Sequence, residues 1–420
     1  MSFTTLRASV RSTGVDSGAY YFDHNATTPI ASAVASQVPS WLAEWGNPSS
    51  IHQVGRGPKA LLRQARDRFA SLIGAQPLEV VFTSGGSESN NFALKGVFEY
   101  YKTKTNALLA NALPGGSPRN RYVVSSVEHP SVIRTIEALR ERGAEVIYLP
   151  VSRSGAIDLE SYRRLLDGQT ALVSVMAANN ETGTIFPIAE MAQMAHEVGA
   201  LFHSDCVQML GKIPIDVRKL GVDLATFSGH KFYSLKGVGA LFVRRGTNLE
   251  SLVQGGGQER HRRGGTENVL AIASLGKMSE LKDEIAARGE EMKRLRDHLE
   301  RRVLHEISGV SVTAGESPRL PNTTSLVIKG VDGETLLMNL DMRGFAVSTG
   351  AACSSGSPEP SPVLLAMGLS RYEAQSSLRL SIGWETSEQE VNHLVEVLGQ
   401  VIAHLRKIAR QEDPAHVNAR

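Results

Sequence analysis

The sequence predicts an α/β fold in which a large domain with a mostly parallel sheet is followed by a smaller α+β domain. Between about Glu79 and Arg245, short runs of β-branched and apolar residues alternate with helical patterns. This alternation is typical of parallel strands that are connected through helices. After Arg245 come a glycine-rich basic loop and a long charged helical stretch, which indicate a second domain. The length of 420 residues allows two domains.

The strands of the large domain are predicted from seven short segments. Several are apolar almost throughout, as expected where helices cover both faces of a sheet. They are Glu79–Thr83, Tyr122–Ser125, Glu145–Pro150, Leu172–Met176, Leu201–His203, Leu224–Phe227 and Ala240–Arg244. Between them, Ile188, Met191 and Ala195 share one face of a predicted helix, and Gly199 is placed to end it.

The second part is predicted to contain helical segments and short strands in turn. These are a helical stretch over Leu270–Ile307, a strand over Ser325–Ile328, a helix over Glu334–Met342, strands over Phe345–Val347 and Ser377–Ile382, and a last helix over Ser387–Ile408. We expect a disordered tail over residues 1–20, a large domain over 21–265 whose first residues pack with the small domain, and a small domain over 266–420. Pro114, Gly115, Gly116 and Pro118 predict an exposed loop over Lys102–Asn120.

Composition excludes several classes of protein. The formal net charge of +2 gives no case for binding nucleic acid or an anionic membrane, and no apolar run approaches the ~20 residues that cross a bilayer. Two cysteines exclude a disulfide framework and favour a reducing compartment, so we expect a cytoplasmic protein. Arg7 and Arg11 leave organellar targeting open. The histidines show no metal-binding spacing, so no metal site is predicted.

Polar residues follow several of the predicted strands, at the edge where open α/β sheets bind ligands. Gly86 and Ser87 lie between a strand and a helix, where backbone amides favour an anion, although a plain turn capped by Ser87 has the same pattern. Asp205 follows the strand Leu201–His203. Such an acid can keep a pyridinium nitrogen protonated, or it can simply cap a helix.

Lysine and cysteine supply two candidate nucleophiles. Lys231 ends the segment Ser228-Gly-His-Lys after a buried strand, where a lysine tends to lose its proton and become able to form a Schiff base. A phosphate-binding or surface lysine is the alternative. Cys353 lies among small residues over 348–357, so we expect an exposed cysteine on a mobile loop. An unreactive filler residue is the alternative.

His129 and Arg379 are two further candidates. His129 follows the strand Tyr122–Ser125 and is placed either to stack on a ring and move protons or to serve a structural role. Arg379 lies among apolar neighbours and therefore needs an anionic partner. A substrate carboxylate and an acidic side chain both meet that need.

Nine segments, taken in order, resemble the cysteine desulfurases of the NifS/IscS kind, which are class V, fold-type I enzymes that use pyridoxal phosphate. The resemblance runs from about Tyr21 to the last helix. The segments are Phe22–Pro29, Gly46–Ser49, Val81–Asn90, Glu128–His129, Asn179–Gly183, Asp205–Gln208, Ser228–Lys231, Arg263–Thr266 and Ser348–Cys353. The implied fold is a fold-type I transferase with a seven-stranded sheet in the large domain.

The resemblance also implies a role for each matching residue. Lys231 carries the cofactor and moves the Cα proton, His129 stacks on the ring and relays a proton, and Cys353 is the nucleophile. Asn180 and Arg379 bind the substrate carboxylate. The implied cofactor contacts are Gly86, Ser87, Ser228 and His230 at the phosphate, Gln208 at the ring hydroxyl, Asp205 at the ring nitrogen, His129, Asn180 and Lys231, with Thr266 reaching the partner subunit's cofactor in a homodimer.

The implied reaction converts L-cysteine to L-alanine and leaves a persulfide on Cys353. The persulfide then passes to an acceptor protein, such as an iron–sulfur scaffold, or serves thiolation. Residues Arg410–Arg420 do not resemble the segment that docks that scaffold in housekeeping members, so the acceptor stays open. Two other functions also stay open, a selenocysteine lyase and a non-catalytic sulfur-assembly protein on the same fold. No nucleic acid or membrane partner is implied.

Overall fold

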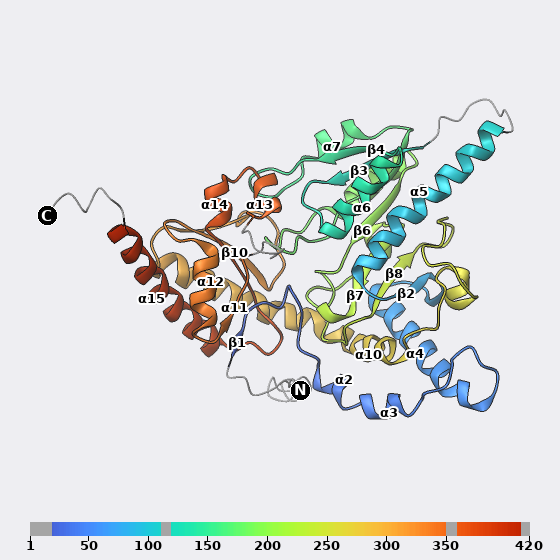
Figure 1. Ribbon diagram of the computed structural model, residues 1–420, viewed down its shortest axis with the longest axis horizontal. Coiled ribbons are helices and arrows are strands. Elements are labelled where there is room, and N and C mark those ends of the chain that lie inside the picture. Colours follow the sequence, from blue (N-terminus) through green and yellow to red (C-terminus); the bar gives the residue numbers. More distant parts are fainter. Residues whose placement is uncertain (1–18, 111–118, 350–358, 413–420) are drawn as a thin grey trace.

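The computed structural model describes residues 19–110, 119–349 and 359–412 and confirms the α/β fold (Figure 1). In the described part of the chain the large sheet has seven strands in the order β2-β8-β7-β6-β5-β3-β4. Strands β3 to β7 pair in parallel, whereas β8 is antiparallel to both β7 and β2. The strands are β2 (Val80–Thr83), β3 (Arg121–Ser125), β4 (Glu145–Leu149), β5 (Thr170–Ser174), β6 (Leu201–Asp205), β7 (Leu224–Ser228) and β8 (Gly239–Val243).

Helices cover both faces of this sheet because neighbouring residues of a strand point to opposite sides. Val80 and Phe82 belong to one hydrophobic core with α4, α8 and α10, while Val81 belongs to another with α5 and α6. The helices of this part are α2 (Ser32–Ala35), α3 (Val38–Leu42), α4 (Arg56–Ile73), α5 (Gly86–Ala110), α6 (Pro130–Glu141), α7 (Leu159–Leu165), α8 (Ile188–Glu197), α9 (Val217–Leu220) and α10 (Val269–Met278).

A second core lies around a small antiparallel sheet of order β12-β10-β9. Strand β1 pairs in parallel with β11, and Phe22 enters the same core as Leu326 and Leu398, so the start of the described chain packs with the small domain. The elements are β1 (Tyr20–Tyr21), β9 (Val310–Val312), β10 (Thr323–Ile328), β11 (Phe345–Ala346), β12 (Ser377–Ser381), α11 (Ile285–Glu306), α12 (Gly333–Asp341), α13 (Pro362–Ala366), α14 (Arg371–Gln375) and α15 (Glu388–Glu412).

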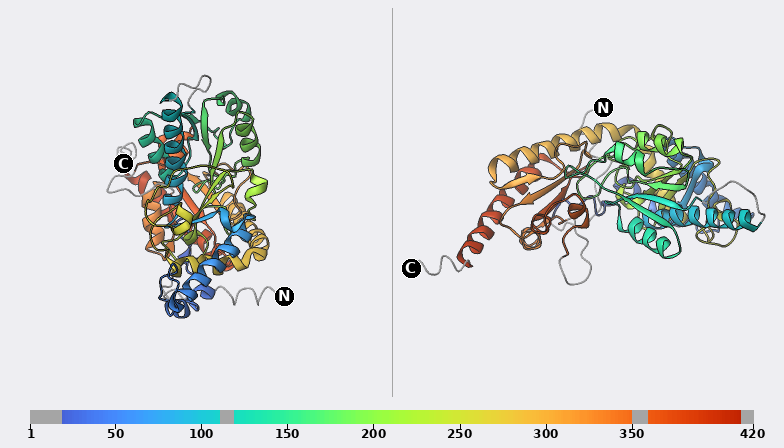
Figure 2. Two further views of the ribbon diagram at one scale, coloured as in Figure 1. Left: turned by 90° about the vertical axis from the view of Figure 1, so that its right-hand side faces the viewer. Right: turned by 90° about the horizontal axis from the view of Figure 1, so that it is seen from above.

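The two cores are joined through α10 and α11 (Figures 1 and 2). Helix α10 packs on α4 in the core of the large sheet, whereas α11 contributes Leu295 and Leu299 to the small core. The division near residue 265 stays a prediction. None of the helices in the described ranges is long and apolar enough to cross a membrane.

The predicted loop over Lys102–Asn120 is wrong in its first half. Helix α5 continues to Ala110, because the helix-breaking residues begin only at Pro114 and the segment 107–110, Ala-Leu-Leu-Ala, favours a helix. Residues 111–118 lie outside the described ranges, as do residues 1–18 of the expected tail, and Tyr20 already belongs to β1. The short strand β9 was not predicted.

Candidate active site

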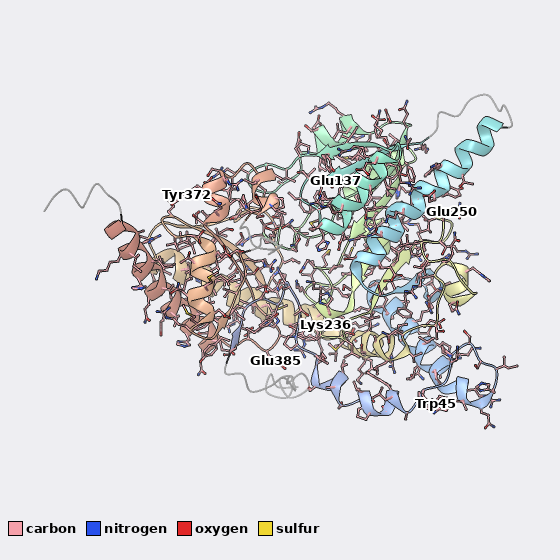
Figure 3. All side chains as sticks on the ribbon, in the orientation of Figure 1. Trp45, Glu137, Lys236, Glu250, Tyr372 and Glu385 are labelled. Atoms are coloured by element: carbon pink, nitrogen blue, oxygen red, sulfur yellow. The ribbon has the colours of Figure 1, made fainter. Side chains whose placement is uncertain are left out.

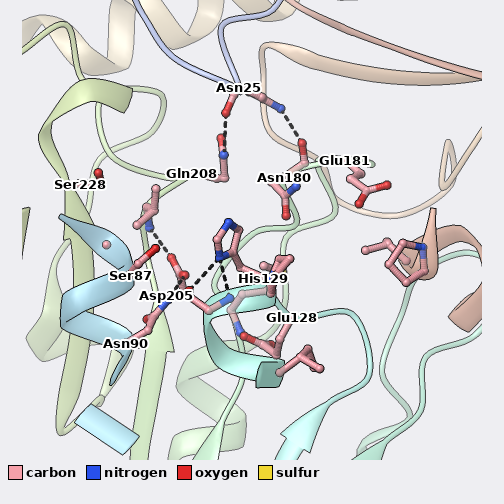
Figure 4. A pocket seen from close by; sticks show the side chains of 18 of the residues that line it. Asn25, Ser87, Asn90, Glu128, His129, Asn180, Glu181, Asp205, Gln208 and Ser228 are labelled. Carbon is pink, nitrogen blue, oxygen red and sulfur yellow. Dashed lines mark hydrogen bonds between the residues drawn. The ribbon is translucent and has the colours of Figure 1, made fainter. Parts of the chain in front are cut away.

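A pocket of about 900 Å³ lies where the large sheet meets the small domain (Figure 4). Its walls come from the ends of β6 and β7, the starts of α5 and α6, and β12. Parallel strands present their carboxyl ends at this edge, which is where open α/β sheets bind ligands. The pocket brings together most of the predicted site residues, namely Gly86, Ser87, His129, Asn180, Asp205, Gln208, Ser228, His230, Lys231 and Arg379.

Lys231 projects from the short 3-10 turn that follows β7. Its Nζ donates a hydrogen bond to the backbone oxygen of Asn25 at 2.5 Å and another to that of Ala26. Burial, with the Arg379 guanidinium adding to its effect and Asp23 and Asp205 opposing it, lowers the pKa of Lys231 to about 8. A substantial share of the amine is therefore neutral, and nucleophilic, near physiological pH.

Asp205 ends β6 and is buried at the floor of the same pocket. Its Oδ2 accepts a hydrogen bond from Asn90 Nδ2 at 2.8 Å, and its Oδ1 accepts one from the backbone N of Val207 at 3.0 Å. Among the described residues these donors are both neutral groups. The carboxylate therefore has no ion-pair partner among the described residues and is placed to pair with a cation that enters the pocket, while Asn90 fixes its direction.

His129 is the N-cap of α6, where Pro130 follows at the first helical position. Its Nδ1 accepts a hydrogen bond from the backbone N of Ser131 at 3.1 Å. Burial lowers the pKa of His129, and Lys231 adds to the lowering while Asp205 opposes it. Because a backbone N–H can only donate, the lone pair is on Nδ1, and the neutral ring carries its hydrogen on Nε2.

Arg379 lines the pocket and forms an ion pair with Asp23. Its Nη2 donates to Asp23 Oδ1 at 2.7 Å, and its Nη1 donates to the backbone oxygen of Asn180 at 3.1 Å. Its Nε is buried without a hydrogen-bond partner in the described chain. The side-chain amide of Asn180 likewise makes no hydrogen bond to a described residue. The ion pair with Asp23 thus anchors the guanidinium and leaves donors for an anion.

The start of α5 forms a small hollow beside Ser228. A Cβ atom built on Gly86 would lie 3.0 Å from Val207 Cγ2 and 3.5 Å from Ser228 Cβ, so any side chain there would fill the hollow. The first N–H groups of α5 point along the helix axis without helical partners and favour an anion. His230 lines the same pocket, and burial, with Lys231 and Lys236 adding to its effect, lowers the pKa of His230 to about 4, so its ring is neutral.

Two buried glutamates of the pocket were not predicted. Glu128 Oε1 accepts hydrogen bonds from Ser125 Oγ at 2.5 Å and from the backbone N of Met176 at 2.7 Å. Burial raises its pKa to about 8. Burial also raises the pKa of Glu181 to about 7, and this carboxyl accepts a hydrogen bond from Ser361 Oγ. Both glutamates lie within segments that carry the family resemblance, but the sequence assigns a function to neither of them.

Thr266 and Cys353 are not placed in the pocket. Thr266 is exposed in the loop before α10 and does not line the pocket. Cys353 lies outside the described residues. The described chain on either side of it does reach the pocket, since Ser348 and Pro362 both line it and Ser348 pairs with Arg379 through the backbone.

Comparisons with known proteins give the family. Residues 20–394 match the family model described as Aminotransferase class-V. "Cysteine desulfurase IscS" of Dictyoglomus turgidum is 42% identical over 95% of this chain and 98% of its own. A solved "NIFS-LIKE PROTEIN" superposes with a TM-score of 0.83 at 33% identity, over 92% of this chain and 100% of that one. The structure "SspA in complex with cysteine" superposes with a TM-score of 0.73 at 32% identity, over 86% of this chain and 98% of that one. The chain therefore belongs to the aminotransferase class-V family and, within it, to the cysteine desulfurases.

Proposed function

We propose that this chain is a pyridoxal-phosphate-dependent cysteine desulfurase that converts L-cysteine to L-alanine and transfers the sulfur to Cys353. One observation carries the proposal. A half-buried amine with a pKa of about 8, Lys231, lines the same pocket as the buried carboxylate of Asp205, whose hydrogen-bond donors among the described residues are both neutral. The relatives named cysteine desulfurase support the reaction, and the similar structure of SspA in complex with cysteine supports the substrate.

The groups that line the pocket fit pyridoxal phosphate. The cofactor, when bound, supplies an aldehyde that captures amines and a ring that accepts electrons from the substrate Cα. Lys231 matches the aldehyde, Asp205 matches a protonated ring nitrogen, and the hollow at Gly86 matches the phosphate. The other proposed contacts are Ser87, Ser228 and His230 at the phosphate, His129 at the ring face, Gln208 at the ring hydroxyl, Asn180, and Thr266 of a second subunit.

The protein groups then bind the substrate and move its protons. Arg379 and Asn180 are placed to hold the substrate carboxylate, which orients the Cα–H bond toward Lys231. Lys231, as a neutral amine, takes the proton from Cα and returns it later in the cycle. Asp205 stabilises positive charge on the ring nitrogen from a buried position, where electrostatic interactions are strong.

Sulfur transfer is assigned to Cys353. Its thiolate attacks the substrate sulfur, so that an S–S bond forms while the substrate Cβ–S bond breaks. A proton added at Cβ completes L-alanine, and the persulfide stays on Cys353. The proposal includes a cytoplasmic location and an acceptor protein, such as an iron–sulfur scaffold, that removes this sulfur.

The function is tested on the purified holoenzyme with L-cysteine and L-selenocysteine as separate substrates. We expect alanine and sulfide in equal amounts from cysteine when a reductant is present. Turnover of selenocysteine alone would identify a selenocysteine lyase instead. A protein that stays colourless after pyridoxal phosphate is added would identify a non-catalytic protein of the same fold.

The lowered pKa of Lys231 predicts how fast the apoenzyme captures its cofactor. Only the neutral amine attacks an aldehyde, so the capture rate should rise with pH and level off above a midpoint near pH 8. An ordinary lysine would show its midpoint near 10.5. Stopped-flow absorbance between pH 6 and pH 10 measures the midpoint. Arg379→Met should move it upward, because this change removes a neighbouring positive charge.

A homodimer is supported by the surface segment 42–54, whose exposed apolar side chains are Leu42, Trp45, Ile51 and Val54. Figure 3 shows Trp45 at the edge of the molecule. Trp45 and Ile51 are 80% and 96% exposed, which is unusual for side chains of their size. We propose that a second copy covers this surface and brings Thr266 to the partner's cofactor. Trp45→Glu should convert the dimer to a monomer in light scattering and weaken cofactor binding. Met342→Glu, at a 75% exposed position in the small domain, is the matched control and should leave the dimer intact.

A further inference from the structure

Lys212 is a buried lysine that the proposed reaction does not use. It is 4% exposed, and it forms no ion pair with a described carboxylate. Its Nζ donates hydrogen bonds to Gln208 Oε1 at 2.5 Å and to Asn25 Oδ1 at 2.8 Å. A buried ammonium group without an acid is costly, and an apolar side chain would fill the same space at lower cost. The position therefore calls for an explanation beyond packing.

The charged and titratable groups that face Lys212 are cations or neutral. Burial lowers its pKa well below the ordinary value, and Lys231 and Arg379 lower it further. Lys212 in turn contributes, after burial, to the lowered pKa of His24. Whether charged or neutral, the Lys212 nitrogen meets two amide oxygens that only accept, so it acts as a donor to both.

The bonds of Lys212 fix the direction of the Gln208 side chain. Gln208 Nε2 donates to the backbone oxygen of Asn25 at 3.1 Å (Figure 4), while Lys212 Nζ donates to Gln208 Oε1 at 2.5 Å. Turning the amide over would place two acceptors together at Asn25 and two donors together at Lys212. Since Gln208 lines the pocket and Nε2 makes this one hydrogen bond to a described residue, its second N–H is left for a ligand.

Lys212 also supports the carbonyl that holds Lys231. The Asn25 side chain bonds to groups on both sides of the domain junction, since Nδ2 donates to the backbone oxygen of Asn180 at 3.1 Å and to Thr323 Oγ1 at 2.9 Å. The backbone oxygen of the same Asn25 accepts from Lys231 Nζ at 2.5 Å. Without Lys212, Gln208 Oε1 would have no hydrogen-bond partner among the described residues, so the Gln208 amide would be free to turn. Asn25 Oδ1 would keep the hydrogen bond that Asn322 Nδ2 donates at 3.2 Å.

We infer that Lys212 is a positioning residue that holds the Gln208 amide with its N–H directed at the ring hydroxyl oxygen of the bound cofactor. The inference rests on the proposed binding of pyridoxal phosphate by this pocket. A hydrogen-bond donor stabilises the deprotonated form of that oxygen. The Gln208 N–H therefore lowers the pH at which the bound cofactor changes its visible absorbance.

The test compares Lys212→Met, Gln208→Leu and the double variant as holoenzymes, with Lys219→Met as the exposed control. The readout is the pH midpoint of the cofactor absorbance. Lys212→Met should raise the midpoint by about one pH unit, the size expected when a hydrogen bond to a charged group is lost. Because Lys212 acts through Gln208, adding Lys212→Met to Gln208→Leu should shift the midpoint much less than it does alone. Lys219→Met should leave it unchanged.

Two outcomes overturn the inference. One is a midpoint for Lys212→Met equal to that of the wild type, even if its melting temperature falls, because a purely structural lysine would give that result. The other is a full additional shift in the double variant. If Lys212→Met does not fold, Lys212→Gln keeps one donor in the network and is measured in the same way, with a smaller upward shift expected. A wild-type protein that binds no cofactor would instead contradict the proposed function.

Discussion

Lys231→Ala is expected to lower alanine formation from cysteine by at least about 10³-fold, since general acid–base catalysis alone contributes roughly 10²–10⁴-fold. The change removes the amine that attaches the cofactor and the base that moves the Cα proton. Its neighbour Lys212 cannot replace it, because the Lys212 Nζ is committed to Gln208 and Asn25. Alanine released per subunit under saturating cysteine measures the effect.

Stability measurements separate this loss from misfolding. The folded-state pKa of Lys231, about 8, lies below its ordinary value of 10.5, so folding disfavours the protonated lysine. The resulting penalty is fully present below pH 8 and disappears as pH rises through 10.5. Replacing the lysine with alanine should therefore raise the free energy of unfolding of the apoenzyme more at pH 7 than at pH 10. Wild-type turnover in Lys231→Ala would show that another group does this chemistry.

The sheet and its ligand-binding edge could be predicted because the signals are local. Each predicted strand of the large sheet is present within a few residues, and Asp205 and Lys231 lie where two of these strands end. Residues such as Asn25 and Lys212 could not be found in this way. Their roles depend on contacts between segments far apart in the chain, and neither sits in a pattern of charge or periodicity that suggests a site.

Arg379 shows why local reasoning leaves alternatives open. An arginine among apolar neighbours needs an anion, but the sequence does not say which one. The structure supplies Asp23 from the first described segment, joined to β12 across the small domain. The same contact that satisfies the structural alternative also fixes the guanidinium at the pocket wall, so the two readings of Arg379 are compatible.

Cys353→Ser is expected to abolish persulfide formation, with sulfide release lowered by about 10³-fold, while cysteine still perturbs the cofactor absorbance. A serine hydroxyl cannot accept sulfur as a persulfide, whereas Lys231, Asp205 and Arg379 remain in place to bind the substrate. Mass spectrometry of the peptide that contains Cys353, with and without cysteine, detects the added sulfur atom. Sulfide release at the wild-type rate would show that the nucleophile is another group.

The geometry around the described ends of this segment favours Cys353 over the other cysteine. Cys353 is five residues along the chain from Ser348, which lines the pocket. Five residues can span at most about 17 Å. On the far side, Ser361 bonds to the pocket residue Glu181. Cys206, in contrast, is fully buried, and burial raises its pKa to about 12, so its thiol is neither accessible nor ionised. Because Cys206 is inaccessible, Cys206→Ala is the matched control and should keep persulfide formation within about two-fold of wild type. Loss of the persulfide in Cys206→Ala but not in Cys353→Ser would reverse the assignment.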